Sequence, residues 1–323
     1  MYNIIVKKYG KPEVLSYEKD TEKKILKNCV KILVASAGIN FADILTIQGR
    51  YQERPRPPFS PGLEVSGIIQ KVGKDVTGFK AGEKVMAIMK YGGYQQNVIV
   101  PAENTYKVPK NMPLIVAGGF PVIYGTAYSA LVTKASIQKG ETCLILGATG
   151  GVGIAAVEIA HAYGAKVIAC GGDDKKLDIC KNKGALHLIN YKKNIIRTQL
   201  LKKNIKEVDV VIDMIGGQAT LDAVKSLSWN GRLVIVGFAS GKIPDIPANR
   251  LLLKNAKAEG LYWGELAYRC PKKIKDDFRS LELLYKNKKI NPSIYKVFKL
   301  SEATQALNYL TNRKNVGKIV LKC

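Results

Sequence analysis

The segment from about residue 114 to 261 alternates short apolar runs with helical patterns, and this alternation constrains the fold more than any other feature of the sequence. Continuous apolar runs are typical of strands that are buried on both faces of a parallel sheet. The helical patterns between them, such as 154–162 and 175–183, would cover those faces. We therefore predict an α/β domain with strands at 142–146, 165–169, 186–190, 208–213 and 231–238.

The first of these strands is followed by a glycine-rich turn and the start of a helix. The turn reads Ala148-x-Gly150-x-x-Gly153. The small first residue allows a tight turn, the second position lets a pyrophosphate approach the backbone, and the third allows close packing of the helix on the strand. Backbone N–H groups at a helix start favour an anion. The motif predicts a dinucleotide site that includes Gly150, Gly151 and Val152.

The end of the next strand bears on the choice between NADPH and NADH. An acidic residue there would accept hydrogen bonds from the adenosine ribose, but Gly171 stands at this position. Gly171 leaves room for a 2′-phosphate, to which Lys175 can donate a charge-assisted hydrogen bond. We therefore expect NADPH. Asp173 keeps an alternative open, because it would be the ribose-binding acid if the strand ran two residues longer.

The first hundred residues have a different pattern, in which short β-branched runs are separated by Gly and Pro. This pattern predicts a mainly β domain. The proline-rich segment 54–62 is expected to form an ordered surface loop beside Tyr51. A chain of 323 residues exceeds what one core usually organises, so we expect two domains, with the tail after about residue 263 returning to the first. The predicted strands of the first domain lie at 30–35, 65–72, 84–88 and 96–100.

The net charge of +25 is compatible with nucleic acid, a membrane surface or a phosphorylated ligand as partner. However, only 9 of the 51 basic residues are Arg, and base recognition relies mainly on Arg. We interpret most of the charge as a solvated Lys-rich surface. A nucleic-acid partner is therefore disfavoured, and attraction of a phosphorylated ligand is the remaining reading.

Cysteines and apolar runs bear on the compartment. The six cysteines form no CxxC pair, so we expect free thiols in a reducing compartment. The longest apolar stretch, 115–132, is interrupted by Gly and Pro and predicts no membrane span. No targeting peptide is visible before the first strand-like run. We expect a cytoplasmic location, with a mitochondrial one open if a transit peptide has been removed.

The order of motifs along nearly the whole chain resembles that of the zinc-independent quinone oxidoreductases, the zeta-crystallin-like members of the medium-chain dehydrogenase/reductase superfamily. The quinone oxidoreductase-like group is the most similar. The resemblance implies a GroES-like, partly open β-barrel catalytic domain, residues 1–122 and 263–323, with an inserted Rossmann dinucleotide-binding domain, residues 123–262. The motifs are 38–43 (GINFAD), 61–67 (PGLEVSG), 82–85 (GEKV), 92–94 (GGY), the glycine turn, 236–238 (VGF), 251–255 (LLLKN), 260–264 (GLYWG) and 317–321 (GKIVL).

The resemblance also implies that no metal is bound. Zinc-dependent relatives have Cys at the position of Asn40 and a His-Glu pair at 63–64, where this chain has Leu-Glu. The cysteine cluster of the structural zinc is missing as well. We therefore expect no Lewis-acid alcohol oxidation. His161 and His187 are expected on a helix surface and at a strand end.

Metal-free hydride transfer from NADPH to a quinone is the activity that the resemblance implies. Asn40 would lie near the nicotinamide ribose and the acceptor, Asp43 would support that loop, and the Tyr51 phenol would face the acceptor oxygen. Leu45 replaces a second tyrosine of some relatives, which puts a tyrosine-pair mechanism in doubt. Alternatively, Asn40 and Asp43 merely cap a helix.

The resemblance places further cofactor contacts outside the glycine turn. They are Thr126, Gly237 and Phe238 at the nicotinamide end, Tyr191 with Lys175 at the 2′-phosphate, and Lys318 at the pyrophosphate.

Three functions therefore stay open. The first is an NADPH-dependent quinone oxidoreductase that acts on a quinone or another electrophilic acceptor. The second is reduction of the double bond of an enal or enone, which needs the same parts. The third is an NADPH-binding protein whose basic surface binds RNA or another polyanion. By resemblance we expect a homodimer, formed by continuation of the Rossmann sheet through an edge strand around 232–238 and onward.

Overall fold

The computed structural model describes residues 1–19 and 24–323. The chain divides into two compact units. The first comprises Met1–Val122, Ala267–Phe278 and Pro292–Cys323, and the second comprises Ile123–Leu266 and Arg279–Asn291. The division after Val122 coincides with the expected boundary between 1–122 and 123–262. The segment expected to return to the first domain, 263–323, contributes 267–278 and 292–323 to the first unit, whereas 263–266 and 279–291 belong to the second.

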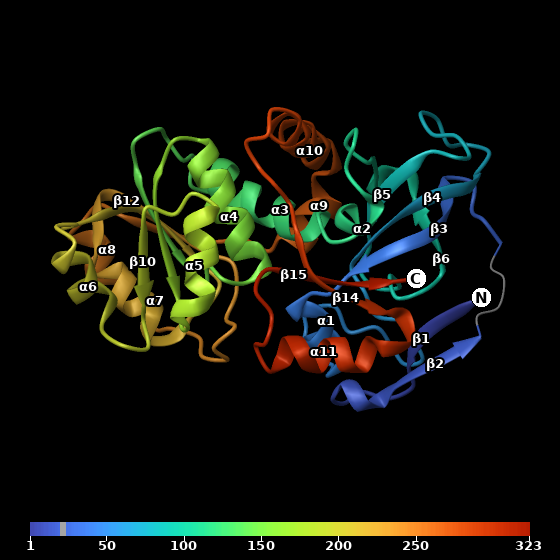
Figure 1. Cartoon of the computed structure of the whole chain (residues 1–323), viewed down its shortest axis with the longest axis horizontal. Coiled ribbons are helices and arrows are strands. Elements are labelled where there is room, and N and C mark those ends of the chain that lie inside the picture. Colours follow the sequence, from blue (N-terminus) through green and yellow to red (C-terminus); the bar gives the residue numbers. More distant parts are fainter. Residues whose placement is uncertain (20–23) are drawn as a thin grey trace. The chain divides into compact units, whose positions relative to one another are not determined.

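The first unit is built on a sheet that, among residues 24–323, has seven strands. Its pairings are antiparallel except that between β14 and β15. Val320 of β15 lies opposite Gly38 of β3, so strands from the two ends of the chain, red and blue in Figure 1, are neighbours. The strands are β3 (Cys29–Gly38), β4 (Glu64–Val72), β5 (Lys84–Ile88), β6 (Asn97–Pro101), β7 (Thr105–Lys107), β14 (Ile294–Lys299) and β15 (Lys318–Lys322).

Alternating apolar residues of β3, including Val30, Ile32 and Val34, are buried in the core of this unit. This period of two is the reason why the strands could be predicted from the sequence. A separate two-stranded sheet and several short helices complete the unit. These are β1 (Tyr2–Val6), β2 (Leu15–Lys19), η1 (Pro12–Val14), α1 (Phe41–Ile47), η2 (Ala102–Asn104), α2 (Leu114–Ala117), η4 (Leu300–Glu302) and α11 (Ala303–Thr311).

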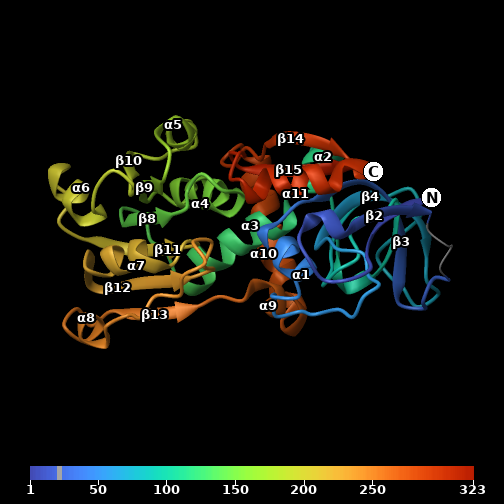
Figure 2. The same cartoon turned by 90° about the horizontal axis from the view of Figure 1, so that it is seen from below.

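The second unit contains a parallel sheet with the strand order β10-β9-β8-β11-β12-β13, which can be followed in Figure 2. This is the doubly wound order of Rossmann folds. The strand predicted around 232–238 is not the sheet edge, because β13 pairs with β12 on its outer side. The strands are β8 (Thr142–Leu146), β9 (Lys166–Gly171), β10 (His187–Asn190), β11 (Val208–Asp213), β12 (Leu227–Ile235) and β13 (Lys257–Gly260).

Helices follow the strands as the alternation predicts. The helix predicted at 154–162 begins earlier, at Gly151, because the glycine turn leads directly into it. Its Ala155, Ala156 and Ala160 are fully buried, and their small size allows close packing on the sheet. The remaining helices are α3 (Pro121–Tyr128), a π-helical turn η3 (Ser129–Lys134), α4 (Gly151–Ala162), α5 (Asp174–Asn182), α6 (Ile196–Lys202), α7 (Gly217–Val224), α8 (Ala248–Leu252), α9 (Trp263–Arg269) and α10 (Pro271–Lys286), which contributes to both units.

All six cysteines are free thiols. Within residues 1–19 and 24–323, none of the helices combines the length and the apolar character needed to cross a membrane.

Candidate active site and cofactor site

A buried polar cluster lies at the start of α1, where Asn40 and Asp43 are predicted to act. The Asn40 backbone N–H donates to Asp43 Oδ2 at 2.7 Å. The Tyr94 hydroxyl donates to the same oxygen, also at 2.7 Å. Asp43 therefore caps the backbone at the helix start, as the alternative reading expected, while the Asn40 side chain has other partners.

The Asn40 side chain joins an ion pair between Glu64 and Lys318. Its Nδ2 donates to Glu64 Oε1 at 3.0 Å, and its Oδ1 accepts from Lys318 Nζ at 2.6 Å. Lys318 Nζ also lies 2.6 Å from Glu64 Oε1 and donates to the Ile39 carbonyl at 2.9 Å. The Lys318 and Glu64 side chains are 2% and 0% exposed. All three ammonium N–H groups thus have protein acceptors, and the expected pyrophosphate contact of Lys318 stays a prediction.

Two glycines provide the space for this ion pair. A Cβ at Gly38 would overlap the Glu64 carboxylate, and one at Gly119 would lie 2.8 Å from Lys318 Cγ. The second oxygen of Glu64 accepts from the Val122 N–H at 2.8 Å. Both carboxylate oxygens therefore have defined partners, which fixes the side chain.

The Asp43 carboxyl is fully buried, and its Oδ1 has no hydrogen-bond partner in the described part of the chain. Burial raises the pKa of Asp43 to about 7, although the hydrogen bonds from Tyr94 and the Asn40 N–H and the charge of Lys318 lower it. The same burial, together with Asp43, raises the pKa of Tyr94 well above its ordinary value. Asp43 can therefore change its protonation state near neutral pH.

The half-buried Tyr51 follows α1 and is held through its backbone. Its N–H donates to the Leu45 carbonyl at 3.2 Å, and its carbonyl accepts from Arg54 Nε at 3.3 Å. The Tyr9 hydroxyl anchors the same loop at the Pro55 carbonyl, at 2.8 Å. The loop is thus ordered by specific contacts, while the role of the phenol stays a prediction.

The glycine turn between β8 and α4 has the geometry of an anion site. Gly147 has a φ of +81°, and Gly150 is the N-cap of α4. A Cβ at Gly153 would overlap the Gly147 carbonyl, so only glycine lets the helix pack this closely on the strand. The N–H groups of Gly151 and Val152, in the first turn of a twelve-residue helix, have no intrahelical acceptor. They fit the pyrophosphate of a dinucleotide.

The loop from β9 to α5 bears on the choice between the dinucleotides. β9 ends at Gly171, and Asp173 is the N-cap of α5, where it accepts from the Lys176 N–H at 3.2 Å. The strand does not reach Asp173, so the alternative that used it as the ribose-binding acid loses its premise. Asp174 forms an ion pair with Lys193, which balances its charge.

Next to this loop, the space around Gly172 is bounded by Tyr191 and Lys192. A Cβ at Gly172 would lie 3.4 Å from Tyr191 Oη and 3.0 Å from Lys192 Cε. Lys175 is exposed in the first turn of α5. Lys192 was not predicted as a site residue, because in a chain with so many lysines its position carries no distinguishing signal.

The residues expected at the nicotinamide end also belong to the second unit. Gly237 and Phe238 follow β12 in the chain. The Gly237 N–H donates to the Asp213 carbonyl at 3.3 Å, which places Gly237 at the carboxyl end of β11. Ligands of doubly wound sheets bind at this edge. Thr126 is a buried residue of α3, and its contact with a nicotinamide stays a prediction.

Comparisons with known proteins agree with this geometry. Residues 27–110 match the alcohol dehydrogenase GroES-like domain family, and residues 151–295 match the zinc-binding dehydrogenase family. Quinone oxidoreductase-like protein 2 of Bos taurus is 39% identical over 309 residues, which cover 95% of this chain and 88% of the relative. The chain belongs to the quinone oxidoreductase-like group of the medium-chain dehydrogenase/reductase superfamily.

Solved structures show the same fold for this quinone oxidoreductase-like chain. The Escherichia coli quinone oxidoreductase complexed with NADPH is 26% identical, with a TM-score of 0.91 over 100% of both chains. The CurK enoyl reductase is 27% identical, with a TM-score of 0.89 over 99% of this chain and 98% of that one. The predicted combination of a GroES-like domain and a Rossmann-type sheet is confirmed, and the superfamily binds NAD(P).

The name of one matched family raises the question of zinc, and the residues around Asn40 do not fit that ion. Zinc in proteins is held by Cys, His and carboxylate groups. Here the Asn40 and Glu64 side chains converge on the Lys318 ammonium, which already supplies a positive charge 2.6 Å from each. Among the residues that the structure describes, no group of three or more His, Cys, Asp and Glu could hold a metal.

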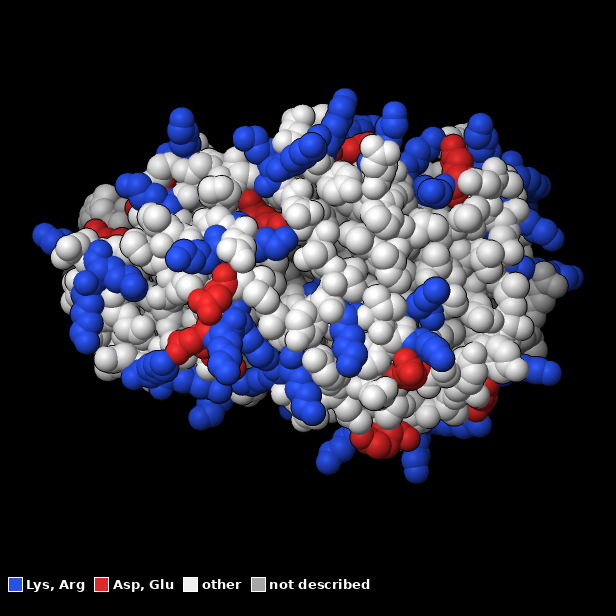
Figure 3. Space-filling model, viewed as in Figure 1, with Lys and Arg blue, Asp and Glu red and all other residues white. Residues whose placement is uncertain are grey.

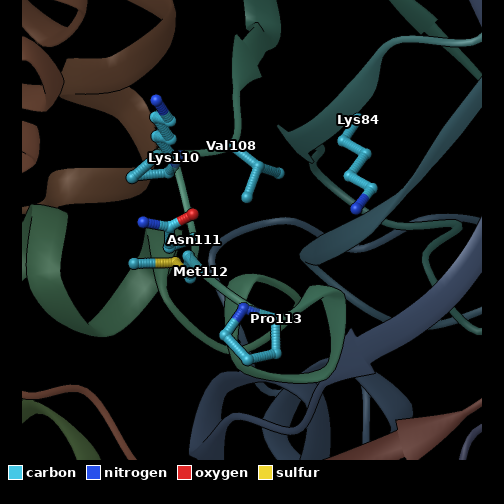
Figure 4. A pocket seen from close by; sticks show the side chains of 7 residues that line it. Lys84, Val108, Lys110, Asn111, Met112 and Pro113 are labelled. Carbon is cyan, nitrogen blue, oxygen red and sulfur yellow. The ribbon is translucent and has the colours of Figure 1, made fainter.

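A pocket of about 410 Å³ in the first unit is lined by Lys84 and residues 108–113 (Figure 4). It shares no residue with the Asn40 cluster. We therefore do not assign it to the candidate active site.

Proposed function

We propose that the chain is an NADPH-dependent quinone oxidoreductase that delivers a hydride directly to a quinone, without a metal ion. The observation that carries this proposal is the Asn40 amide held by Lys318 and Glu64. Zinc-dependent relatives have Cys where this chain has Asn40, whereas here the Asn40 side chain contacts the Lys318 ammonium and the Glu64 carboxylate. Acceptors that need no Lewis acid suit such a site.

NADPH, when bound, supplies the hydride. The first-turn N–H groups of α4, at Gly151 and Val152, bind its pyrophosphate. The second N–H of the Asn40 amide and the Tyr51 phenol donate to the oxygen that becomes negative as the quinone is reduced. Asp43 keeps the backbone at Asn40 in place through the Asn40 N–H. The hydride brings both electrons and one hydrogen, so the reduced quinone takes one proton from solvent.

NADPH is preferred over NADH in this proposal because of the loop after β9. Gly171 and Gly172 bring no carboxylate to this loop, and Lys175, Tyr191 and Lys192 supply donors for a 2′-phosphate. The Asp173 carboxylate accepts from the Lys176 N–H as the N-cap of α5, so in this proposal it does not bind the ribose hydroxyls. The loop therefore accepts the extra charge.

Reduction of an enal or enone double bond is the second candidate, and the similarity to the CurK enoyl reductase favours it.

The polyanion-binding reading has less support, because the face shown in Figure 3 carries Lys and Arg scattered over both units instead of gathered in one band.

We also propose a homodimer that forms at the edge strand β13. Among the described residues, β13 has β12 as its only strand neighbour, so its outer backbone groups can pair with a second copy. Trp229, which is 65% exposed, lies in β12, and Leu252 and Leu253, which are 78% and 68% exposed, lie in the segment that leads to β13. Burial of these side chains in a dimer would stabilise it.

The acceptor class is tested by following NADPH oxidation with 9,10-phenanthrenequinone, 1,4-benzoquinone and a 2-alkenal side by side, with and without a chelator. We expect NADPH oxidation with the quinones, at a rate that the chelator does not lower. Activity confined to the alkenal would replace the proposal by the second candidate, and loss of activity on chelation would contradict a metal-free site.

A further inference from the structure

The hydrogen bonds of the Asn40 side chain allow only one orientation of its amide. The Lys318 ammonium can only donate, so it must face Oδ1, and the Glu64 carboxylate can only accept, so it must face Nδ2. A flipped amide would place its N–H groups against the ammonium and its oxygen against the carboxylate. The cluster therefore presents the second N–H of Nδ2 as the group that is left for a ligand.

The positive charge of Lys318 also compensates the buried negative charge of Glu64. Glu64 is fully buried, and a buried carboxylate without a cation would be strongly destabilising. The ammonium lies 2.6 Å from Glu64 Oε1 and is itself 2% exposed. The space left by Gly38 and Gly119 fits this pair, so the cluster is built around the two side chains.

We propose that Lys318 is a positioning residue, a fixed internal cation that neutralises Glu64 and orients the Asn40 amide with its N–H toward the acceptor. The effect on catalysis rests on the proposed function, whereas the neutralisation of Glu64 and the orientation of the Asn40 amide do not. It differs from a pyrophosphate contact, because all three N–H groups of Lys318 are bound within the first unit.

The test compares Lys318→Met, Glu64→Gln, the double variant of both, Asn40→Ala, and the triple variant that adds Asn40→Ala to the double one. Lys322→Met is the matched control, since Lys322 is exposed on the same strand. Melting temperature, the Kd for NADPH from protein fluorescence, and kcat at saturating NADPH are measured for each protein. The double variant carries no buried charge at either position, so it stays informative if Lys318→Met alone does not fold.

We expect Lys318→Met to lower the melting temperature strongly and Glu64→Gln to restore most of that loss in the double variant, because it removes the unpaired carboxylate. The double variant should bind NADPH within about twofold of wild type, yet lose about tenfold or more in kcat, because the amide orientation is no longer fixed. Adding Asn40→Ala to it should cost little more, since the two act as a unit. Lys322→Met should behave as wild type.

An NADPH Kd raised about tenfold in the double variant, with kcat at saturation unchanged, would overturn the inference in favour of a cofactor contact. Additive effects of the Lys318 and Asn40 substitutions on kcat would also overturn it. If the wild-type protein reduces none of the acceptors, the proposed function fails instead, while the melting temperatures and the NADPH Kd still decide whether Lys318 pairs with Glu64 or binds the cofactor.

Discussion

The Tyr94 hydroxyl donates to the buried Asp43 carboxyl across 2.7 Å, and so connects α1 with a residue 51 positions later in the chain. Burial keeps the pKa of this carboxyl at about 7, above the ordinary value of 3.8. Protonated Asp43 is therefore favoured in the folded protein at pH values where it would be ionised in the unfolded chain.

The first prediction concerns this carboxyl. Between about pH 4 and 7 the folded state binds a proton that the unfolded state does not, so Asp43 lowers the stability by about 1.4 kcal/mol for each pH unit of increase. Asp43→Asn keeps an acceptor for Tyr94 and removes this titration. Melting temperatures from pH 4.5 to 7.5 should fall more steeply for wild type than for the variant. Parallel curves would show that Asp43 does not titrate in this range.

The second prediction concerns the 2′-phosphate. Lys175→Ala should raise the KM for NADPH about tenfold with little effect on that for NADH, because only NADPH carries the charge that Lys175 would bind. Lys181→Ala, an exposed lysine at the other end of α5, is the control. Equal changes for both cofactors would mean that Lys175 does not read the phosphate.

Substitutions at two glycines of the turn should affect stability and NADPH binding separately. Gly153→Ala should destabilise the protein by about 1–3 kcal/mol, because the new Cβ would overlap the Gly147 carbonyl. At Gly150 a Cβ would lie 3.5 Å from that oxygen, so Gly150→Ala should fold normally and weaken NADPH binding. Denaturant unfolding and cofactor titration measure the two effects, and a stable Gly153→Ala protein would contradict the packing argument.

Tyr51→Phe should lower kcat with the quinone about tenfold if the phenol donates to the acceptor oxygen. Its backbone hydrogen bonds, to Leu45 and from Arg54, do not involve the phenol, so these two contacts remain in the variant. An unchanged kcat would leave Tyr51 with a role in the shape of the site.

The dimer can be tested at its apolar surface. Leu252→Glu with Leu253→Glu should shift the protein in size-exclusion chromatography from a dimer to a 35.4 kDa monomer, because charge opposes burial. Leu283→Glu, at a position of α10 that is 57% exposed, should not. A wild-type protein that already elutes as a monomer would disprove the proposed dimer.

The sequence was sufficient to predict the Rossmann part of the fold, because strands buried on both faces leave continuous apolar runs and the turn needs its glycines. The sequence predicted strand ends and side-chain partners less well where tertiary contacts determine them. The strand predicted at 231–238 begins too late, because β12 starts at Leu227 and its exposed residues Trp229 and Asn230 interrupt the apolar run. Asn40 and Asp43 could be named from their motif. The partners Tyr94, Glu64 and Lys318 could not be assigned to them, because the pairing of β15 with β3 brings distant segments together.

The measurement that tests the central claim most directly is a single-turnover reaction of the protein with NADPH deuterated at the transferred position and 9,10-phenanthrenequinone, without oxygen. Direct hydride transfer predicts one hydroquinone per NADPH and a slower reaction for the deuterated cofactor, in the presence of a chelator as in its absence. A protein that binds NADPH but leaves it unoxidised in the presence of the quinone would contradict the account.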